Sequence, residues 1–290
     1  MTAPISVPSP MASERKLARR ENWILIRKRP GFIVGSVIAL IWVACALFGP
    51  QIAPHNAFDD YAKPNLTPRS GHLFGTDGLG RDVFSRVIVG ARNVLSIAPP
   101  AAILSIVLGT MVGLLMGYRR GLIDNIVSRI VEALLSLPTV LIALLAVTTL
   151  GKSNTVVISI VALLFTPIVA RTVRSAVLGE RDLDYVTSAK LRGESNFFIM
   201  FREILPNVSG PIVVELTVRI GYAIFTVATL SFLGAGPPPP TADWGAQVSE
   251  NFSNLLGHLW WPTIFPALAI ASLVIAVNLI ADAVQSVLEA

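Results

Sequence analysis

Apolar and polar stretches alternate along this chain in long blocks. The apolar blocks are the candidate membrane helices, and they cover residues 31–48, 94–118, 131–150, 156–178, 208–233 and 262–281. A helix that crosses a bilayer needs about 20 mostly apolar residues, and Trp23 and Trp42 can anchor the somewhat short first block at the interfaces. The pattern therefore predicts an all-α polytopic membrane protein with six transmembrane helices.

The composition agrees with a membrane protein and excludes an ordinary soluble domain. Hydrophobic residues make up 53% of the 290 residues and charged residues only 14%, whereas soluble domains carry about 25% charged residues. The mean hydropathy is +0.67. The single cysteine, Cys45, lies in the first apolar block, so neither an internal disulfide nor a metal site built from several thiolates is possible.

The basic residues are distributed unevenly between the polar segments. Seventeen of the 23 Lys and Arg lie in the amino-terminal tail, after the second block, or between Arg171 and Arg219. Because cytoplasmic segments of membrane proteins carry excess Lys and Arg, this distribution predicts that both termini are cytoplasmic. The net charge of +5 is then a consequence of membrane topology, and we expect no nucleic-acid partner.

These patterns predict a division of the chain into four parts. They are a cytosolic basic tail (1–30), a first transmembrane helix (31–48), an extracytoplasmic loop (49–93) and a core transmembrane domain (94–285) that contains a cytosolic loop (179–206). The extracytoplasmic loop contains the glycine-rich run GHLFGTDGLGRD at residues 71–82. This run lacks the strand-to-helix junction and lysine of a phosphate-binding loop, so we expect an exposed, turn-rich loop.

The loop at residues 179–206 is the longest charged interruption in the second half of the chain. Val186 and Ala189 would share one helical face, Gly193 would form a turn, and apolar residues return at helical spacing after it. We expect a helix, a glycine turn and a second helix, presented to a soluble partner in the cytosol. An ordinary connecting loop is the alternative.

No group of residues has the spacing of a catalytic site. His55, His72 and His258 are scattered without metal-ligand spacing. The tripeptide Gly151-Lys152-Ser153 resembles the end of a nucleotide-binding motif, but Ala146 stands where its earlier glycine would be. We therefore expect no enzyme activity and no cofactor bound by this chain alone.

Two further patterns concern the apolar blocks themselves. Gly109, Gly113 and Gly117 recur every four residues, which is typical of a face where two membrane helices pack closely. Glu215 and Arg219 are four residues apart in the fifth block and can form an ion pair on one helical face. We favour a structural pair over a contact with substrate in the translocation path.

The 179–206 loop also carries a family resemblance. Ser188-Ala189, Gly193 and Leu205-Pro206 resemble the "EAA" loop of binding-protein-dependent ABC importer permeases, although Thr187 stands where that family usually has Glu. The resemblance implies that these residues form the coupling loop, which docks onto an ATPase subunit.

Three other motifs resemble the C-type subunit of the dipeptide/oligopeptide permease family. They are FGTDGLGRDVFSR (74–86), LSFLGAG with DWG (230–236 and 243–245) and WWPTIFPALAI (260–270), and the resemblance covers residues 23–282. It implies the type I ABC importer permease fold in a bacterial plasma membrane, surrounded by lipid.

The implied partners are a second homologous permease, two ATP-binding subunits that use ATP and Mg, an extracytoplasmic binding protein and a peptide substrate. A permease for nickel complexes or glutathione is the alternative within the family. A stand-alone channel or secondary transporter is the alternative of another class.

Overall fold

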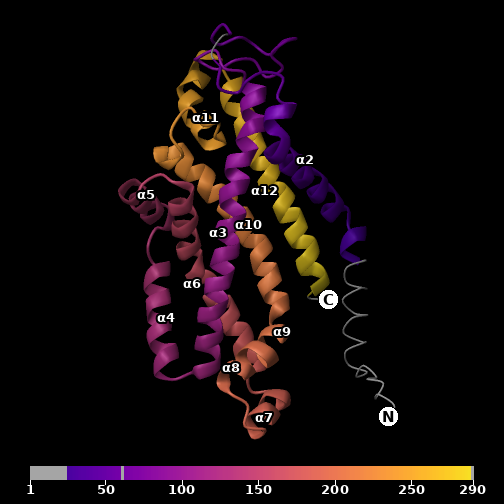
Figure 1. Cartoon of the computed structure of the whole chain (residues 1–290), viewed down its shortest axis with the longest axis vertical. Helices are drawn as coiled ribbons and strands as arrows, with labels where there is room; N and C mark the ends of the chain where they lie inside the picture. The colour runs from indigo at the N-terminus through magenta and orange to yellow at the C-terminus, as the bar shows by residue number, and fades with distance from the viewer. Residues whose placement is uncertain (1–24, 60–61, 289–290) are drawn as a thin grey trace, which may run out of the picture.

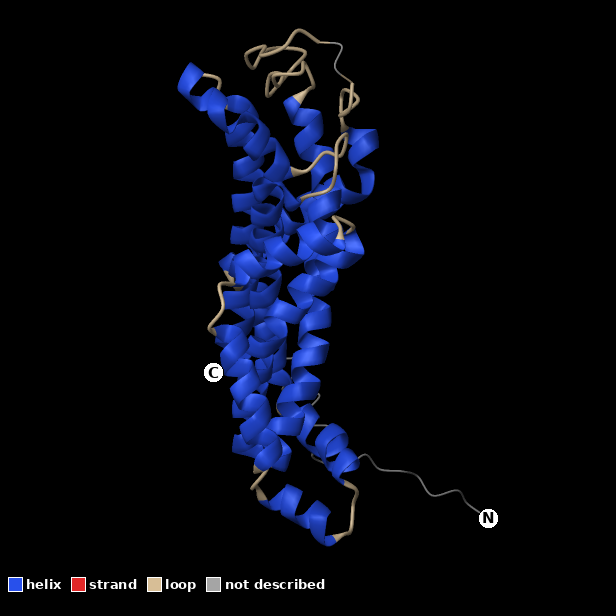
Figure 2. Ribbon diagram, turned by 90° about the vertical axis from the view of Figure 1, so that its left-hand side faces the viewer, coloured by secondary structure: helices blue, strands red, loops and turns tan. Residues whose placement is uncertain are grey.

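The structure is a computed structural model that describes residues 25–59 and 62–288. Within these residues it contains helices and loops but no strand, only two isolated bridges near residues 69–82 (Figure 2). This confirms the all-α prediction. The long helices are α2 (Pro30–Ile52), α3 (Val83–Arg119), α4 (Leu122–Leu135), α5 (Thr139–Leu150), α6 (Asn154–Glu180), α10 (Ser209–Leu230) and α12 (Trp261–Leu288).

Shorter helices connect the long ones at the two ends of the molecule. They are α7 (Asp184–Leu191), α8 (Asn196–Phe198), the π-helix η1 (Ile199–Ile204), α9 (Leu205–Asn207), the π-helix η2 (Ser231–Ala235), α11 (Trp244–Asn251) and the 3₁₀-helix η3 (Phe252–Gly257). The molecule is elongated, and α3 runs along most of its length (Figure 1). We call the end that holds residues 53–82 and α11 the loop end, and the end that holds α7 and α8 the coupling end.

Five helices in the described residues are long and apolar enough to cross a membrane. A sixth crossing is possible only if α4 and α5 act together, and these two helices are bent by 85° at their junction. The expected third span over residues 131–150 is therefore not one continuous helix but lies within the bent pair α4 and α5. Pro138 is the N-cap of α5, and since proline disfavours helical geometry at the residue before it, Leu137 cannot continue α4 into α5.

The first two long helices extend beyond their expected bounds. α2 covers Pro30–Ile52 rather than residues 31–48, and α3 begins at Val83, so residues 83–93 are helical and not part of a loop. The reason for the early start is local. The Asp82 carboxylate accepts a hydrogen bond from the Ser85 backbone N–H at 2.8 Å and caps the helix. Residues 1–24 of the expected basic tail lie outside the described residues.

Helices α3 and α6 pack closely against each other, and glycines on α3 make this approach possible. A Cβ atom added at Gly113 or Gly117 would lie 2.7 Å from the Cβ of Val173 or Val177, respectively. Such distances are too short for real carbon contacts, so only glycine permits this approach. The expected close-packing face is thereby confirmed.

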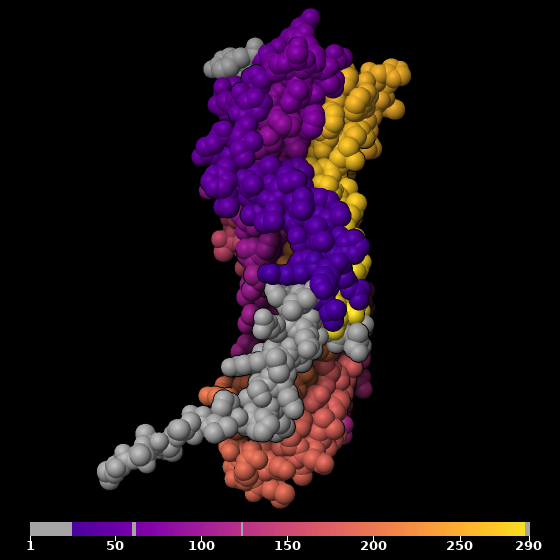
Figure 3. Space-filling view, turned by 90° about the vertical axis from the view of Figure 1, so that its right-hand side faces the viewer, coloured from indigo at the N-terminus to yellow at the C-terminus, as the bar shows by residue number. Residues whose placement is uncertain are grey.

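The amino-terminal helix α2 lies on the outside of the bundle. It lies along α12 (Figure 3). At Gly35 the two helices approach so closely that an added Cβ would lie 2.6 Å from the Ala276 carbonyl oxygen. Most of its apolar side chains are exposed, among them Leu40 and Leu47. An exposed and almost wholly apolar helix is what lipid contact requires.

Candidate functional site

At the coupling end, residues 179–206 contain the end of α6, the short helix α7, a tight turn and a second helical segment made of α8, η1 and the start of α9. Helix α7 ends at Leu191, Gly193 has a φ of +77°, and α8 begins at Asn196. The Gly193 and Glu194 N–H groups donate to the carbonyl oxygens of Lys190 and Ala189 at 3.0 and 3.2 Å. The predicted helix, glycine turn and second helix are confirmed, and the turn requires the positive φ that glycine adopts freely.

One face of α7 is buried and the other is open. Val186 and Ala189 are fully buried in a cluster with Ile199 and Ile204. Thr187 and Ser188 are exposed. Ala189 therefore anchors α7 to the bundle, whereas the side chains of Thr187 and Ser188 face away from the protein.

The second half of the coupling loop departs from α-helical geometry. Residues Ile199–Ile204 form a π-helix immediately before Leu205, which is half-buried, and Pro206, which is exposed. Pro206 has no N–H to donate to the carbonyl four residues earlier, and its ring crowds that carbonyl. A local change to longer-range hydrogen bonds accommodates such a position.

Polar side chains attach the coupling loop to the end of α3. The Tyr118 hydroxyl donates to Asn196 Oδ1 at 2.9 Å, and Arg181 Nη1 donates to the Tyr118 carbonyl at 2.9 Å. The Tyr185 hydroxyl donates to Glu180 Oε2 at 2.7 Å. Burial, together with this hydrogen bond, raises the pKa of Tyr185 to about 12. The loop is therefore fastened to both α3 and α6.

Large apolar side chains remain uncovered at the same end. Leu191 is 85% exposed and Phe197 is 68% exposed, and they lie on the two sides of the Gly193 turn. Leu183, just before α7, is also exposed. An apolar surface of this kind, on a short helix outside the bundle, is typical of a site for another protein.

Within the bundle, Glu215 and Arg219 form the expected ion pair on α10. Arg219 Nε lies 2.8 Å from Glu215 Oε1, and both side chains are largely buried. The guanidinium group also lies over the Tyr222 ring, at 4.8 Å from its centroid, and near the Phe165 ring at 5.7 Å. The pair is therefore enclosed by aromatic side chains of α10 and α6.

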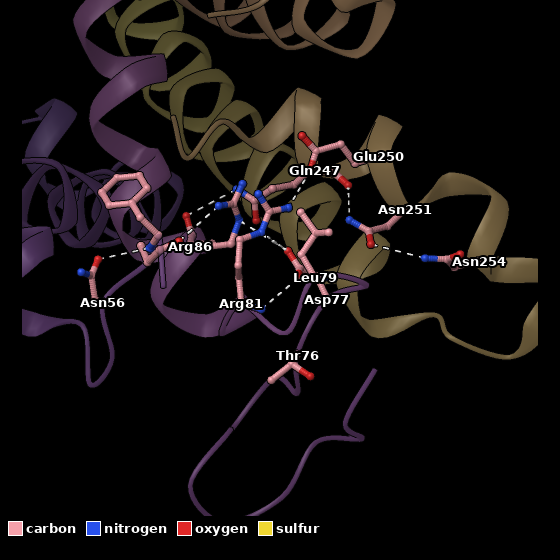
Figure 4. Close-up of polar contacts among 12 residues, drawn as sticks. Asn56, Thr76, Asp77, Leu79, Arg81, Arg86, Gln247, Glu250, Asn251 and Asn254 are labelled. Atoms are coloured by element: carbon pink, nitrogen blue, oxygen red, sulfur yellow. Dashed lines mark hydrogen bonds and ion pairs between the residues drawn. The ribbon is translucent and has the colours of Figure 1, made fainter. Parts of the chain in front are cut away.

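At the loop end, the glycine-rich run is turn-rich, as expected, but only partly exposed: Leu73 and Leu79 are exposed, whereas residues 75–77 and 80–82 are buried. Asp77 and Arg86 are only 2% and 1% exposed. Asp77 Oδ2 accepts from Arg81 Nε at 2.7 Å, and Arg81 Nη2 donates to Glu250 Oε2 of α11 at 2.8 Å (Figure 4). Burial alone would lower the pKa of Arg81, but the carboxylates of Asp77 and Glu250 outweigh it and raise that pKa.

Two tryptophans connect the remaining motifs to the same place. Trp244 Nε1 donates to the Val87 carbonyl at 2.8 Å, and Trp261 Nε1 donates to the Thr76 carbonyl at 3.0 Å. Trp244 is fully buried against Gly90, where an added Cβ would overlap the indole ring. The motifs at residues 74–86, 243–245 and 260–270, which are far apart in sequence, therefore meet in one cluster.

The loop end also brings two of the three histidines together. His55, His72 and Asp82 each place one metal-ligating atom within 4.8 Å of the other two. The expectation of scattered histidines is wrong for this pair, whereas His258 is not part of the group. Sequence spacing gave no signal because the group forms only when the loop folds back onto the start of α3.

Two family models match this chain, and together they cover parts of both ends of the molecule. Residues 109–290 match the family of binding-protein-dependent transport system inner membrane components, and residues 19–68 match the N-terminal transmembrane domain of oligopeptide transport permease C. These ranges include the coupling loop, α2 and part of the loop end.

Individual relatives cover nearly the whole chain. The glutathione transport system permease protein GsiD of Pectobacterium atrosepticum is 36% identical over 93% of this chain and 90% of its own length. The dipeptide transport system permease proteins DppC of Bacillus subtilis and Haemophilus influenzae are 36% and 33% identical, over 93% and 97% of this chain and 85% and 97% of their own lengths. The chain therefore belongs to the family of binding-protein-dependent transport system inner membrane components.

Proposed function

We propose that this chain is the permease subunit of an ATP-driven ABC importer for dipeptides and oligopeptides. The observation that carries the proposal is the coupling loop, because it combines a family-like Ala189, Gly193 and Leu205-Pro206 pattern with an uncovered apolar surface. Two relatives are named dipeptide permeases. The peptide substrate is proposed from those names.

The coupling loop is proposed to dock onto one of two partner ATPase subunits. ATP and Mg would be bound by those subunits and not by this chain. Thr187, Ser188 and Gly193 are exposed and would face the ATPase, while Ala189 holds α7 against the bundle. This assignment places the coupling end and both termini in the cytoplasm and the loop end outside a bacterial plasma membrane, as the distribution of basic residues favours.

A second, homologous permease subunit is proposed to cover the groove between α10 and α12. The groove has a volume of about 450 Å³ and is lined by apolar side chains, including Phe225, Phe232 and Ile275. A homologous membrane helix would fill it without leaving a polar group unsatisfied. An extracytoplasmic binding protein would deliver peptide at the loop end.

The test is uptake of a radiolabelled dipeptide by cells that lack their own dipeptide permease. These cells would express this chain with the subunits that co-purify with it. We expect accumulation of dipeptide that stops when the ATPase subunit is inactivated. Purification without any ATPase, or uptake that continues without ATP hydrolysis, would favour a stand-alone channel or secondary transporter and contradict the proposal.

Glutathione is the second candidate substrate because GsiD is 36% identical to this chain. A competition experiment distinguishes glutathione from dipeptides as the substrate. Excess unlabelled glutathione should leave dipeptide uptake unchanged if peptides are the substrate, whereas transport of labelled glutathione that dipeptides cannot inhibit would favour the second candidate.

A further inference from the structure

Three side chains at the loop end place their metal-ligating atoms within 4.8 Å of one another: His55, His72 and Asp82. His72 Nδ1 lies 2.8 Å from Asp82 Oδ1, and His55 Nδ1 lies 3.8 Å from Asp82 Oδ2. The two imidazole rings are stacked, with 4.7 Å between their centroids. We propose that His55, His72 and Asp82 bind one divalent transition-metal ion of the zinc type.

The carboxylate in this group is held in place by the fold. The Asp82 side chain is 2% exposed, and its Oδ2 atom accepts from both the backbone N–H and the hydroxyl of Ser85 at 2.8 Å. The His55 backbone N–H donates to the same Ser85 hydroxyl at 3.1 Å. Hydrogen bonds that orient a ligand in this way raise the metal affinity of a site.

The donor set indicates which class of metal fits. Two imidazole nitrogens and one carboxylate oxygen suit Zn²⁺ and its neighbours, whereas Ca²⁺ and Mg²⁺ prefer oxygen ligands alone. A metal at Nδ1 would replace the hydrogen that joins His72 to Asp82, and the neutral ring would carry its proton on Nε2. Both imidazole ligands are then neutral, so the charges among the ion and its three ligands are those of the ion and of the Asp82 carboxylate.

Space for the ion and a further ligand is present beside the group. A cavity of about 290 Å³ is lined by the three residues together with Asn56 and Asp59. Three protein ligands leave one position of a tetrahedral ion open, which water or a small anion would complete. The bound ion would tie the segment after α2 and the loop at residue 72 to the first turn of α3.

The experiment uses the full chain purified with its partner subunits through a tag without histidine, since the chain itself has only three. After treatment with a chelator, the complex is titrated with ZnCl₂ in competition with a chromophoric chelator. We expect one tight site per chain. His55→Gln should weaken it at least tenfold, because loss of even an indirect partner of a metal site commonly costs 10–100-fold.

The matched control is His258→Gln, which removes the histidine outside the group and should leave zinc affinity unchanged. Wild-type affinity in His55→Gln, or the absence of binding at micromolar zinc in the wild-type complex, would overturn the proposal. His55 is 43% exposed, so its variant should melt like the wild type in chelator, with zinc raising only the wild-type Tm.

A second measurement needs no variant, so it tests the proposal even if His55→Gln destabilises the protein. X-ray absorption at the zinc edge of the wild-type complex should show scattering from two imidazole rings. A spectrum with oxygen ligands only would contradict the assignment.

Discussion

At the residue scale, Glu215 and Arg219 form a largely buried ion pair within the membrane helix α10. Both side chains are about nine-tenths buried, with the Arg219 guanidinium over aromatic rings. Removing one partner of a buried pair costs about 3–5 kcal/mol because the other charge stays buried and unpaired. Removing both partners avoids that penalty.

We therefore expect Arg219→Ala to lower the amount of folded chain in the membrane and its Tm in detergent. The double variant Glu215→Ala, Arg219→Ala should be milder than the single one. Thermal unfolding of both variants is the measurement, and a double variant that is as unstable as Arg219→Ala would show that the pair is not the stabilising unit.

The same substitution distinguishes a structural pair from a contact with substrate. If the pair is structural, residual uptake by Arg219→Ala should fall equally for acidic, basic and neutral peptides. Selective loss of acidic peptides in competitive uptake would instead place Arg219 in the translocation path.

A second residue-scale prediction concerns Arg81, which joins Asp77 to Glu250. Arg81→Ala leaves the buried Asp77 carboxylate without its main partner, so we expect a loss of about 3 kcal/mol in stability. Arg69→Ala, in the same loop but exposed, is the control and should change stability by less than about 0.5 kcal/mol. Equal Tm values for the two variants would contradict this account of the loop end.

At the element scale, α3 can pack closely on α6 because its glycines have no side chain. Gly113→Ala would force a carbon atom to within 2.7 Å of Val173, and overpacking of this kind costs about 1–3 kcal/mol. Gly179→Ala on α6 is the matched control, because nothing lies within 4 Å of its added Cβ. We expect a lower Tm for Gly113→Ala only, and a tolerant Gly113 would mean that the helices can separate at little cost.

The coupling turn gives a sharper prediction about docking. Gly193 and Gly234 both have positive φ, +77° and +84°, and neither has an atom within 4 Å of an added Cβ. Aspartate tolerates such a backbone better than most residues, so both Gly193→Asp and Gly234→Asp should insert and fold. Only Gly193→Asp should reduce recovery of the ATPase in a pull-down and lower uptake, because only that residue faces the proposed partner. Normal ATPase recovery with Gly193→Asp would contradict the docking assignment.

The features predicted correctly from the sequence are those set by interactions between residues close together in the chain. The helix–turn–helix around Gly193 and the pairing of Glu215 with Arg219 depend on residues a few positions apart, so their spacing was sufficient. The bend at Pro138 was missed because the apolar run was interpreted as a single span, although a proline inside a helical pattern ends or kinks the helix. The His55–His72–Asp82 group and the Asp77–Arg81–Glu250 network were missed since they arise from long-range folding of the loop.

At the scale of the whole molecule, orientation in the membrane remains a prediction from charge. Two single-cysteine variants would test this orientation: Ser188→Cys at the coupling end and Ser70→Cys at the loop end. Each is made in a Cys45→Ala background, because Cys45 is the only native thiol. In sealed cells an impermeant thiol reagent should label position 70 and spare position 188. The reverse result would invert the topology and remove the cytosolic docking surface.

Helix α3 has a mechanical consequence for transport. Its 37 residues make a rod of about 55 Å. One end carries the Asp82 cap within the loop end, and the other carries the Tyr118 contacts with the coupling loop. Because α6 packs closely against the glycine face of α3, the two helices should move together as one rigid unit. A tilt imposed on the coupling end by the proposed ATPase would then reach the opposite membrane surface directly, without a chain of side-chain rearrangements between them.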